Sequence, residues 1–500
     1  MPVMLSEFRK RIDVLLGYVT MYKLVEIGLM AIAAMALPLM ATGYLPYSPV
    51  GFLISIALLV GTAGGSNWLF GWLFGVKPQL DSGLITGLIL ALIFSPPTTF
   101  VEGVQLVLVA AIAMASKYII AIRNKHIFNP AAFAAAVASI GGLAFATWWV
   151  ASPALLPVTV IVAALVLHKT QKFTVAGTFL AAAFVMIVVQ TILNGTFSPQ
   201  TLGAILTSWP FVFFAGIMLV EPLTLPPTHR QQLIIAVVVG VLATLSVHYG
   251  SVSMTPALAL VIGNAVAFYM GIRQAVRLRF VAKKRQSKDA YEFTFDAPKF
   301  HYQPGQYIEL SLPHAKTDFR GTRRIFTIIG RPDDEQLSIA TRFPERHSTF
   351  KDELLKLKPG KVLHGLRVAG DFVLSEDKSA PILCIAGGIG ITPFVSFVMN
   401  SGDRDITILY SVNRVDDLAF VKEFDYYDAK VTVVTDDDGH LPSKDWKREK
   451  GRITPELLKR HITPETHVYV SGPPAMVTSV KDLARAAGAK FIHTDHFSGY

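Results

Sequence analysis

The sequence predicts a multi-domain protein, with a polytopic α-helical membrane domain followed by a small antiparallel β-barrel and a parallel α/β domain. Charge distribution is the first indication, because 17 Asp, Glu, Lys or Arg residues lie in the first 272 positions and 65 lie in the remaining 228. Apolar runs long enough to span a bilayer fill the first part. Beyond it, alternating strands give way near residue 380 to strands that alternate with helices. We expect domain limits of 1–273, 274–376 and 377–500.

Hydropathy places about ten spans near residues 24–41, 50–74, 82–96, 104–121, 129–150, 153–168, 174–193, 204–220, 232–248 and 254–272. The intervening loops alternate in charge. Loops on one side carry ten Lys or Arg residues, and those on the other side (42–49, 97–103, 151–152, 194–203 and 249–253) carry none. By the positive-inside rule, the N-terminus and the C-terminal half are cytoplasmic in an integral cell-membrane protein. The N-terminal segment SEFRKR lacks a cleavage-site pattern, so we expect no removed signal peptide.

Two sequence matches suggest that the membrane domain repeats itself. ILALIFSPPT (89–98) resembles IMLVEPLTLPPT (217–228), and NPAAF (129–133) resembles NAVAF (264–268). Both matches link spans five apart, and an odd number predicts two halves of opposite orientation, with a functional site between them. Asn129 begins a helix with Pro130, and we expect it either to cap that helix or to contact a cofactor. For Asp81 and Glu221, a solvated interfacial role and a functional one remain open.

The net charge of +10 divides equally between the two parts, and no nucleic-acid-binding motif is present, so no nucleic-acid partner is expected. Cys384 is the single cysteine, which excludes disulfides, a cysteine-ligated iron–sulfur cluster and a four-cysteine zinc site. The basic run that joins the two parts, from Arg273 to Arg285, is typical of a juxtamembrane anchor to anionic lipid.

LDSGLITGLILALIFSPP, KHIFNPAAF and FFAGIMLVEPLTLPPT resemble the membrane subunits of the Rnf complex and of the sodium-pumping NADH:quinone oxidoreductase over most of residues 60–270. The resemblance implies a flavin in the membrane domain, with Asn129 a candidate contact. Those subunits can carry flavin on a Thr in an outer loop. The corresponding loop here, WWVASPALLP, has no Thr at that position, so the resemblance implies non-covalent FMN or riboflavin.

Two motifs in the barrel region are suited to a flavin. RRIFTIIG supplies Arg324 for a phosphate, Phe326 for stacking and Thr327 for a hydrogen bond to a ring nitrogen. PGQYIEL precedes it, and Tyr307 joins the candidate set.

Three further motifs follow in the α/β region. AGGIGITPF places Gly387, Gly388 and Gly390 after a strand, and Thr392 opens a helix, an arrangement typical of pyrophosphate binding. YVSGPPAMV places Ser471, Gly472 and Pro473 at the carboxyl end of a later strand, where ligands bind in such folds. The terminal DHFSGY offers Phe497 or Tyr500 as a cover for the flavin face, or a frayed tail. Cys384 lies mid-strand and is expected in the core.

The order and spacing of these motifs resemble the ferredoxin–NADP reductase family over residues 276–500. The resemblance implies FAD at Arg324, Phe326 and Thr327 with Ser348 and Thr349 near its phosphates, and NAD(P)H at the glycine-rich turn. It also implies catalytic positions for Thr327 and Ser471, beside the reacting rings. Phe326 replaces the usual Tyr, and Ser471 replaces a frequent Cys. Arg414 favours a 2′-phosphate whereas Asp416 or Asp417 favours a ribose diol, and we lean towards NADH.

Together the two parts predict electron transfer from cytosolic NAD(P)H through FAD and a membrane flavin to an extracytosolic flavoprotein or quinone. Haem is not expected, because His126, His168, His229 and His248 all lie at span ends. One alternative is a redox-driven sodium or proton transporter, which suits an inverted repeat. Another is a flavin reductase that the membrane domain only anchors.

Overall fold

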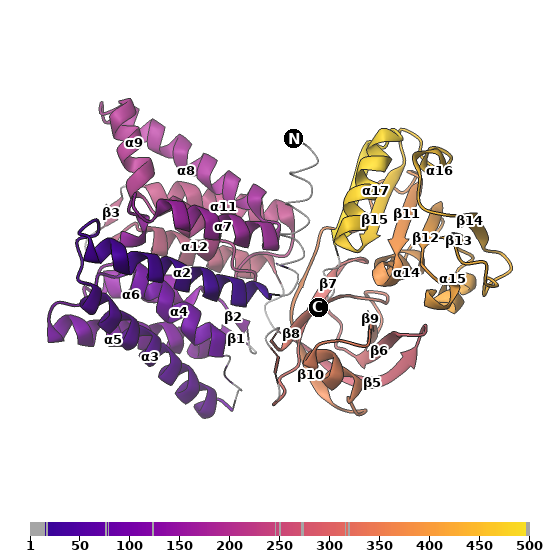
Figure 1. Cartoon of the computed structure of the whole chain (residues 1–500), viewed down its shortest axis with the longest axis horizontal. Coiled ribbons are helices and arrows are strands. Elements are labelled where there is room, and N and C mark those ends of the chain that lie inside the picture. Colours follow the sequence, from indigo (N-terminus) through magenta and orange to yellow (C-terminus); the bar gives the residue numbers. More distant parts are fainter. Residues whose placement is uncertain are drawn as a thin grey trace. The chain divides into compact units, whose positions relative to one another are not determined.

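The computed structural model describes residues 16, 19–75, 78, 80–122, 125–245, 247–249, 252–271, 275–315, 317–318 and 321–496. The chain divides into two compact units with a boundary between Gln274 and Ala275. Figure 1 draws the helical unit in indigo to rose and the later sheets in rose to yellow. Phe497 and Tyr500 lie outside the described residues, so their predicted place over a flavin stays a prediction.

The helical unit consists of apolar helices joined by short segments. They are α2 (Met21–Ala41), α3 (Pro49–Leu73), α4 (Leu80–Ile93), α5 (Phe100–Ile119), α6 (Pro130–Ile140), α7 (Leu156–Thr170), α8 (Phe173–Leu193), α9 (Pro199–Ser208), α10 (Phe211–Phe213), α11 (His229–Thr244) and α12 (Pro256–Met270), with a 3-10 turn η1 (Trp149–Ala151) and a π-helix η2 (Phe214–Met218). Within the described residues, α2, α3, α5 and α8 are long and apolar enough to cross a membrane, which suggests membrane anchoring. Each of the ten predicted stretches contains helix, but the span count itself stays a prediction.

One series of elements occurs twice in this unit. α5 is followed by the hairpin β1–β2 (Ala121–Ile122 and Lys125–His126) and then α6, and α11 is followed by β3–β4 (His248–Tyr249 and Val252–Ser253) and then α12. α5 and α11 both begin with a capping box, and α6 and α12 both begin with a proline. When the starts of α6 and α12 are aligned, the N-cap residue Asn129 corresponds to the N-cap residue Thr255, which lies nine residues before Asn264. The sequence match of NPAAF to NAVAF was therefore out of register, because repetitive apolar sequence specifies register weakly.

Equivalent helices of the two halves contact one another, since α2 packs on α7 and α6 packs on α12. Gly28 permits the first contact, because a Cβ there would lie 2.4 Å from Cγ1 of Val162. Contact between equivalent elements is characteristic of a twofold relation. At the end of α4, the indole N–H of Trp149 donates to the carbonyls of Ala91 and Phe94 at 3.1 and 2.9 Å, which satisfies backbone groups freed at that break.

The first sheet of the C-terminal unit is antiparallel, as predicted. It contains β5 (Val276–Arg285), β6 (Ala290–Asp296), β7 (Tyr307–Ser311), β8 (Arg323–Thr327), β9 (Gln336–Arg342) and β10 (Val362–Ala369) in the order β8-β7-β10-β5-β6-β9. β8 and β9, the two ends of this order, also contact each other, so the sheet curls into a barrel. The basic run lies largely in β5, where Arg279 pairs with Asp296 and Lys284 with Glu423 at 2.7 and 2.8 Å. These two residues thus make ion pairs within the C-terminal unit, and a contact of the basic run with anionic lipid stays a prediction.

The second sheet is wholly parallel, also as predicted. Its strands are β11 (Ile382–Gly387), β12 (Ile406–Ser411), β13 (Lys430–Thr435), β14 (Lys447–Lys450), β15 (His467–Gly472) and β16 (Phe491–His496), in the order β14-β13-β12-β11-β15-β16. Its helices are α14 (Thr392–Met399), α15 (Val421–Tyr426), α16 (Pro455–Lys459) and α17 (Pro474–Ala486). The strand order reverses between β11 and β15. Ligands of open α/β sheets bind at such a switch point, beyond the carboxyl ends of the strands.

Candidate functional site

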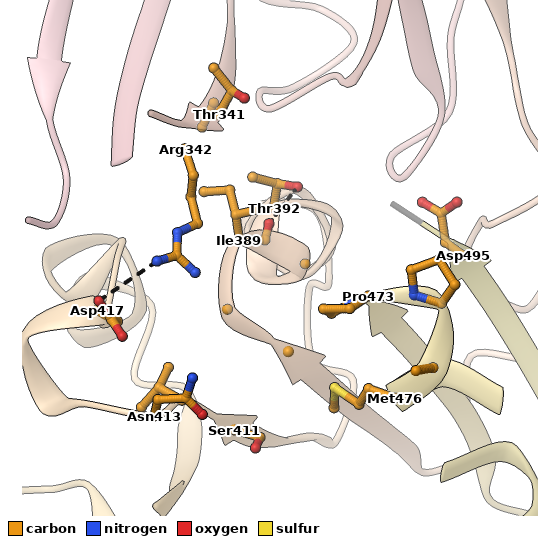
Figure 2. A pocket seen from close by; sticks show the side chains of 18 of the residues that line it. Thr341, Arg342, Ile389, Thr392, Ser411, Asn413, Asp417, Pro473, Met476 and Asp495 are labelled. Atoms are coloured by element: carbon orange, nitrogen blue, oxygen red, sulfur yellow. Dashed lines mark hydrogen bonds and ion pairs between the residues drawn. The ribbon is translucent and has the colours of Figure 1, made fainter. Parts of the chain in front are cut away.

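A large cavity of about 1100 Å³ lies in the C-terminal unit, and side chains of both sheets line it. This volume slightly exceeds the roughly 300–1,000 Å³ that is usual for small-molecule sites. The cavity brings together most of the residues that the sequence singled out. They are Tyr307, Arg324, Phe326, Thr327, Gly387, Gly388, Gly390, Thr392, Gly472 and Pro473. We call it the dinucleotide cavity, and Figure 2 shows part of its lining.

Barrel strand β8 presents the predicted flavin-binding residues to this cavity. The Arg324 guanidinium is buried and lies over the Phe350 ring, 5.2 Å from its centroid. Its Nη1 donates to the carbonyl of Arg323 at 2.6 Å. The rings of Phe326 and Phe350 are 6.0 Å apart. Phe350 therefore fixes both side chains, although nothing in its local sequence indicated that role.

The segment around Ser348 and Thr349 differs from the prediction in detail. Neither residue is in the lining of the cavity. Thr349 Oγ1 lies 2.9 Å from His314 Nε2 and accepts the Asp318 N–H at 3.0 Å, so this hydroxyl joins two loops. Ser348 Oγ is buried and has no hydrogen-bond partner among the described residues. A phosphate contact for these two residues stays a prediction.

Neighbouring basic side chains line the cavity instead. Arg346, His347 and Lys351 belong to the same stretch, and Lys351 is buried with its Nζ donating to the Arg342 carbonyl at 2.9 Å. None of these three residues was predicted from the sequence, because scattered basic residues in a loop resemble an ordinary protein surface. Arg346 and Lys351, together with Arg324, give this side of the cavity the positive charge that a diphosphate requires.

The glycine-rich turn lies between β11 and α14, at the topological switch point. Gly388 has φ of +55°, a backbone conformation that favours glycine. At Gly390 a Cβ would lie 2.4 Å from the Ser471 carbonyl oxygen, so the two loops touch only because this side chain is absent. Thr392 opens α14, and its Oγ1 donates to the Ile389 carbonyl at 3.2 Å. The turn thus exposes backbone N–H groups and a helix start to the cavity.

The turn after β15 completes this side. Gly472 and Pro473 line the cavity, whereas Ser471 is fully buried outside its lining. Ser471 Oγ has no hydrogen-bond partner among the described residues, so its predicted role beside the nicotinamide stays a prediction. Cys384 is fully buried on β11 and burial raises the pKa of its thiol, so it belongs to the core, as expected.

An ion-pair cluster connects the barrel to the far side of the cavity. Arg342 of β9 donates from Nη2 and Nε to the Asp289 carboxylate at 2.7 and 2.9 Å, and its Nη2 lies 3.9 Å from Asp417 Oδ1. The hydrogen bonds to Asp289 raise the pKa of Arg342. Figure 2 shows Arg342 and Asp417 facing each other across the cavity. Asp417 is in the lining together with Asp436, whereas Asp416 and Arg414 are not.

Asn129 lies in the helical unit, where its polar groups serve the fold. Its Oδ1 accepts the Ala132 N–H at 3.0 Å, its Nδ2 donates to Glu221 at 2.9 Å, and its backbone N–H donates to Asn264 Oδ1 at 2.9 Å. His126 Nε2 is 3.4 Å from Glu221 Oε1. Asn129 is thus the helix cap that the sequence allowed, and a cofactor contact stays a prediction.

A smaller cavity of about 60 Å³ adjoins Asn129, His126 and Glu221, and residues of α2, α4, α7 and η2 also line it. This volume holds a few water molecules. It is well below the roughly 300 Å³ from which small-molecule sites start, so it does not fit an isoalloxazine ring.

The C-terminal half of the chain is similar to known oxidoreductases. Residues 384–482 match the oxidoreductase NAD-binding domain. Flavohemoprotein B of Dictyostelium discoideum is 28% identical over 215 residues, which are 36% of this chain and 48% of that protein. The glycine betaine monooxygenase reductase subunit of Chromohalobacter salexigens is 24% identical over 233 residues, 43% of this chain and 62% of that protein. The chain thus spans about half to two thirds of the length of these relatives.

Solved structures resemble the same half of the chain. The FAD/NAD-binding domain of nitric oxide dioxygenase from Vibrio cholerae is 18% identical, with a TM-score of 0.38, covering 44% of this chain and 98% of that domain. The fold, the lining of the dinucleotide cavity and the NAD-binding match together define the C-terminal half. It is an FAD-dependent NAD(P)H oxidoreductase module of the ferredoxin–NADP reductase type.

Proposed function

We propose that this chain passes electrons from cytosolic NAD(P)H through FAD to a carrier in the helical unit, and then to an acceptor on the other side of the membrane. One observation carries the first half of this proposal. A single cavity holds the flavin-type residues of β8 and the glycine-rich turn after β11, so a hydride donor and acceptor can share it.

The residues present fit FAD. Arg324, Arg346 and Lys351 offer cationic donors for its diphosphate, and Phe326 offers a flat face. The buried Ser348 Oγ is a further donor that lacks a partner among the described residues. Thr327 places a hydroxyl at the end of β8, where it would hydrogen-bond the ring edge. When bound, FAD accepts a hydride and releases two electrons singly, which is the chemistry that a relay needs.

The opposite wall suits a pyridine dinucleotide, and we propose NADH rather than NADPH. The glycine-rich turn and the start of α14 would hold the pyrophosphate. Asp436 directly follows β13, and Asp417 ends the 3-10 turn η4 (Val415–Asp417) in the segment after β12, on the side of the sheet where the adenosine ribose of a bound dinucleotide is expected. Two carboxylates accept hydrogen bonds from a ribose diol and repel a 2′-phosphate.

The membrane half of the proposal rests on the repeated architecture and on the resemblance of its segments to flavin-carrying membrane subunits. A single cytosolic flavin lies too far from the opposite surface of a hydrocarbon layer roughly 30 Å thick, so a carrier is needed within it. Because the small cavity at Asn129 does not fit a flavin ring, we assign the carrier no contacts. FMN or riboflavin is the carrier that the resemblance implies, and a flavoprotein or a quinone is the acceptor class.

Extraction of cofactors from the purified full-length protein tests this proposal. We expect FAD together with a second redox group, released without covalent attachment to the polypeptide. FAD alone, with no other redox group, would end the relay and leave a membrane-anchored flavin reductase. A preparation that neither contains nor rebinds FAD would contradict the assignment of the dinucleotide cavity itself.

A further inference from the structure

Four flat side chains form a continuous row across the last two strands of the parallel sheet. Phe491 and His467 stack with centroids 4.6 Å apart and planes within 5°, and Tyr469 and His493 stack at 4.4 Å and 13°. Both are register pairs of β15 and β16. The row therefore belongs to the edge of the sheet, because β16 is the outermost strand.

A hydrogen bond between two imidazoles joins the stacked pairs. His467 Nδ1 lies 3.3 Å from His493 Nε2, and the two rings have centroids 5.5 Å apart and planes within 10°. These values require the rings to meet edge to edge in nearly one plane, with the two nitrogens facing each other. One nitrogen must carry the shared proton and the other must accept it, so the contact needs at least one neutral imidazole. We call this contact the imidazole pair.

Among the described residues, the charges that act on the pair leave a second proton largely uncompensated. Asp377 and Arg404 act on His467 with opposite signs. Tyr469 donates to the Val373 carbonyl at 3.0 Å, and burial raises its pKa to about 12, so it stays neutral. Burial lowers the pKa of both imidazoles, and for His493 the neighbouring His467 lowers it further.

The position of the pair links it to the dinucleotide cavity. Asp495 follows His493 by two residues, so it lies on the same face of β16, and it lines the cavity. Figure 2 shows Asp495 near Pro473 of the turn that also lines it. β16 is an edge strand and forms backbone hydrogen bonds with β15 alone. Side-chain contacts between these two strands are therefore important for keeping β16 on the sheet.

We propose that the imidazole pair is a pH-sensitive latch that holds β16, and with it Asp495, at the dinucleotide cavity. In the neutral form the shared proton binds the two strands together. When both rings are protonated, the N–H···N bond is lost and two positive charges face each other, so the strand edge loosens. The inference rests on the proposed use of a dinucleotide in this cavity.

The sign of the pH effect follows from the lowered pKa values. Since the folded protein binds these protons less readily than the unfolded chain, the latch is fully effective above the ordinary histidine pKa of about 6.5 and weakens as the pH falls below it. We therefore expect kcat/KM for NADH to fall about fivefold between pH values of about 7.5 and about 5.5. Hydrogen exchange of the β16 amides should become faster over the same range.

The test uses the full-length protein in detergent, with His467→Phe and His493→Phe as separate variants. Phenylalanine keeps a flat ring in the row and removes the titrating group, so either variant should flatten both pH profiles. His461→Phe is the matched control, since His461 is a partly buried histidine outside the row whose pKa burial also lowers. It should keep the wild-type profiles.

Identical pH profiles in wild type and the two row variants would overturn the latch, as would β16 exchange that does not respond to pH in the wild type. Retention of bound FAD at about pH 7.5 shows that a variant is folded. Because both variants remove the same hydrogen bond, one folded variant is enough for the test. If the wild type oxidised no NADH at any pH, the proposed function would fail, while hydrogen exchange would still decide the latch.

Discussion

At the scale of single residues, we propose that the Asp417 carboxylate contributes to the choice between NADH and NADPH. It lines the cavity and lies 3.9 Å from Arg342, whose guanidinium Asp289 already engages. A 2′-phosphate near Asp417 would face a carboxylate and find this arginine occupied. The sequence left Arg414, Asp416 and Asp417 open as alternatives, and of these three Asp417 is the one in the lining of the cavity.

Replacing Asp417 by Asn should therefore improve the use of NADPH. The repulsion between the Asp417 carboxylate and a 2′-phosphate is removed, so the NADPH/NADH ratio of kcat/KM should rise about tenfold, equivalent to about 1.4 kcal/mol. Stopped-flow reduction of the bound FAD by each dinucleotide measures this ratio. Asp438→Asn is the control, because Asp438 pairs with exposed Lys450 and lies outside the lining. An unchanged ratio in Asp417→Asn would remove Asp417 from the selection.

At the scale of elements, the strand–turn–helix after β11 was the most predictable part of the site. Gly387, Gly388, Gly390 and Thr392 form a local pattern whose function depends on backbone geometry, and all four line the cavity. Ser348 and Thr349 were less predictable, because their neighbours come from distant segments. Thr349 meets His314 and Asp318 some thirty residues earlier, and Arg324 rests on Phe350. Such pairings depend on tertiary packing that no local motif encodes.

Gly390→Val should abolish NADH oxidation while leaving FAD bound. The new Cβ would start 2.4 Å from the Ser471 carbonyl, so the glycine-rich turn must move away from the β15 turn and deform the dinucleotide side of the cavity. The flavin side belongs to the barrel and should be unaffected. Flavin absorbance and steady-state NADH oxidation measure the two effects. Gly439→Ala is the control, since a Cβ there meets nothing closer than 3.4 Å. Substantial NADH oxidation by Gly390→Val would contradict this role of the turn.

At the scale of the whole molecule, the sequence predicted the soluble architecture better than the membrane architecture. Period-two alternation in β5 and glycine-marked strand ends each report a local geometry, and both sheets formed as expected. In the helical unit, apolar composition indicates helix without fixing register or depth. For this reason the sequence match paired Asn129 with Asn264, nine residues beyond the equivalent helix start. For the same reason, ten apolar stretches were predicted as spans, whereas four of the described helices are long and apolar enough to cross a membrane.

The proposed passage of electrons across a bilayer can be measured in sealed proteoliposomes. The protein is reconstituted with a membrane-impermeant acceptor trapped inside, and NADH is added outside, where it reaches only those copies whose C-terminal unit faces outward. We predict NADH-dependent reduction of the trapped acceptor, abolished by Gly390→Val. If the same protein reduced an acceptor only when it shared the NADH compartment, electrons would not cross the membrane and the account would be contradicted.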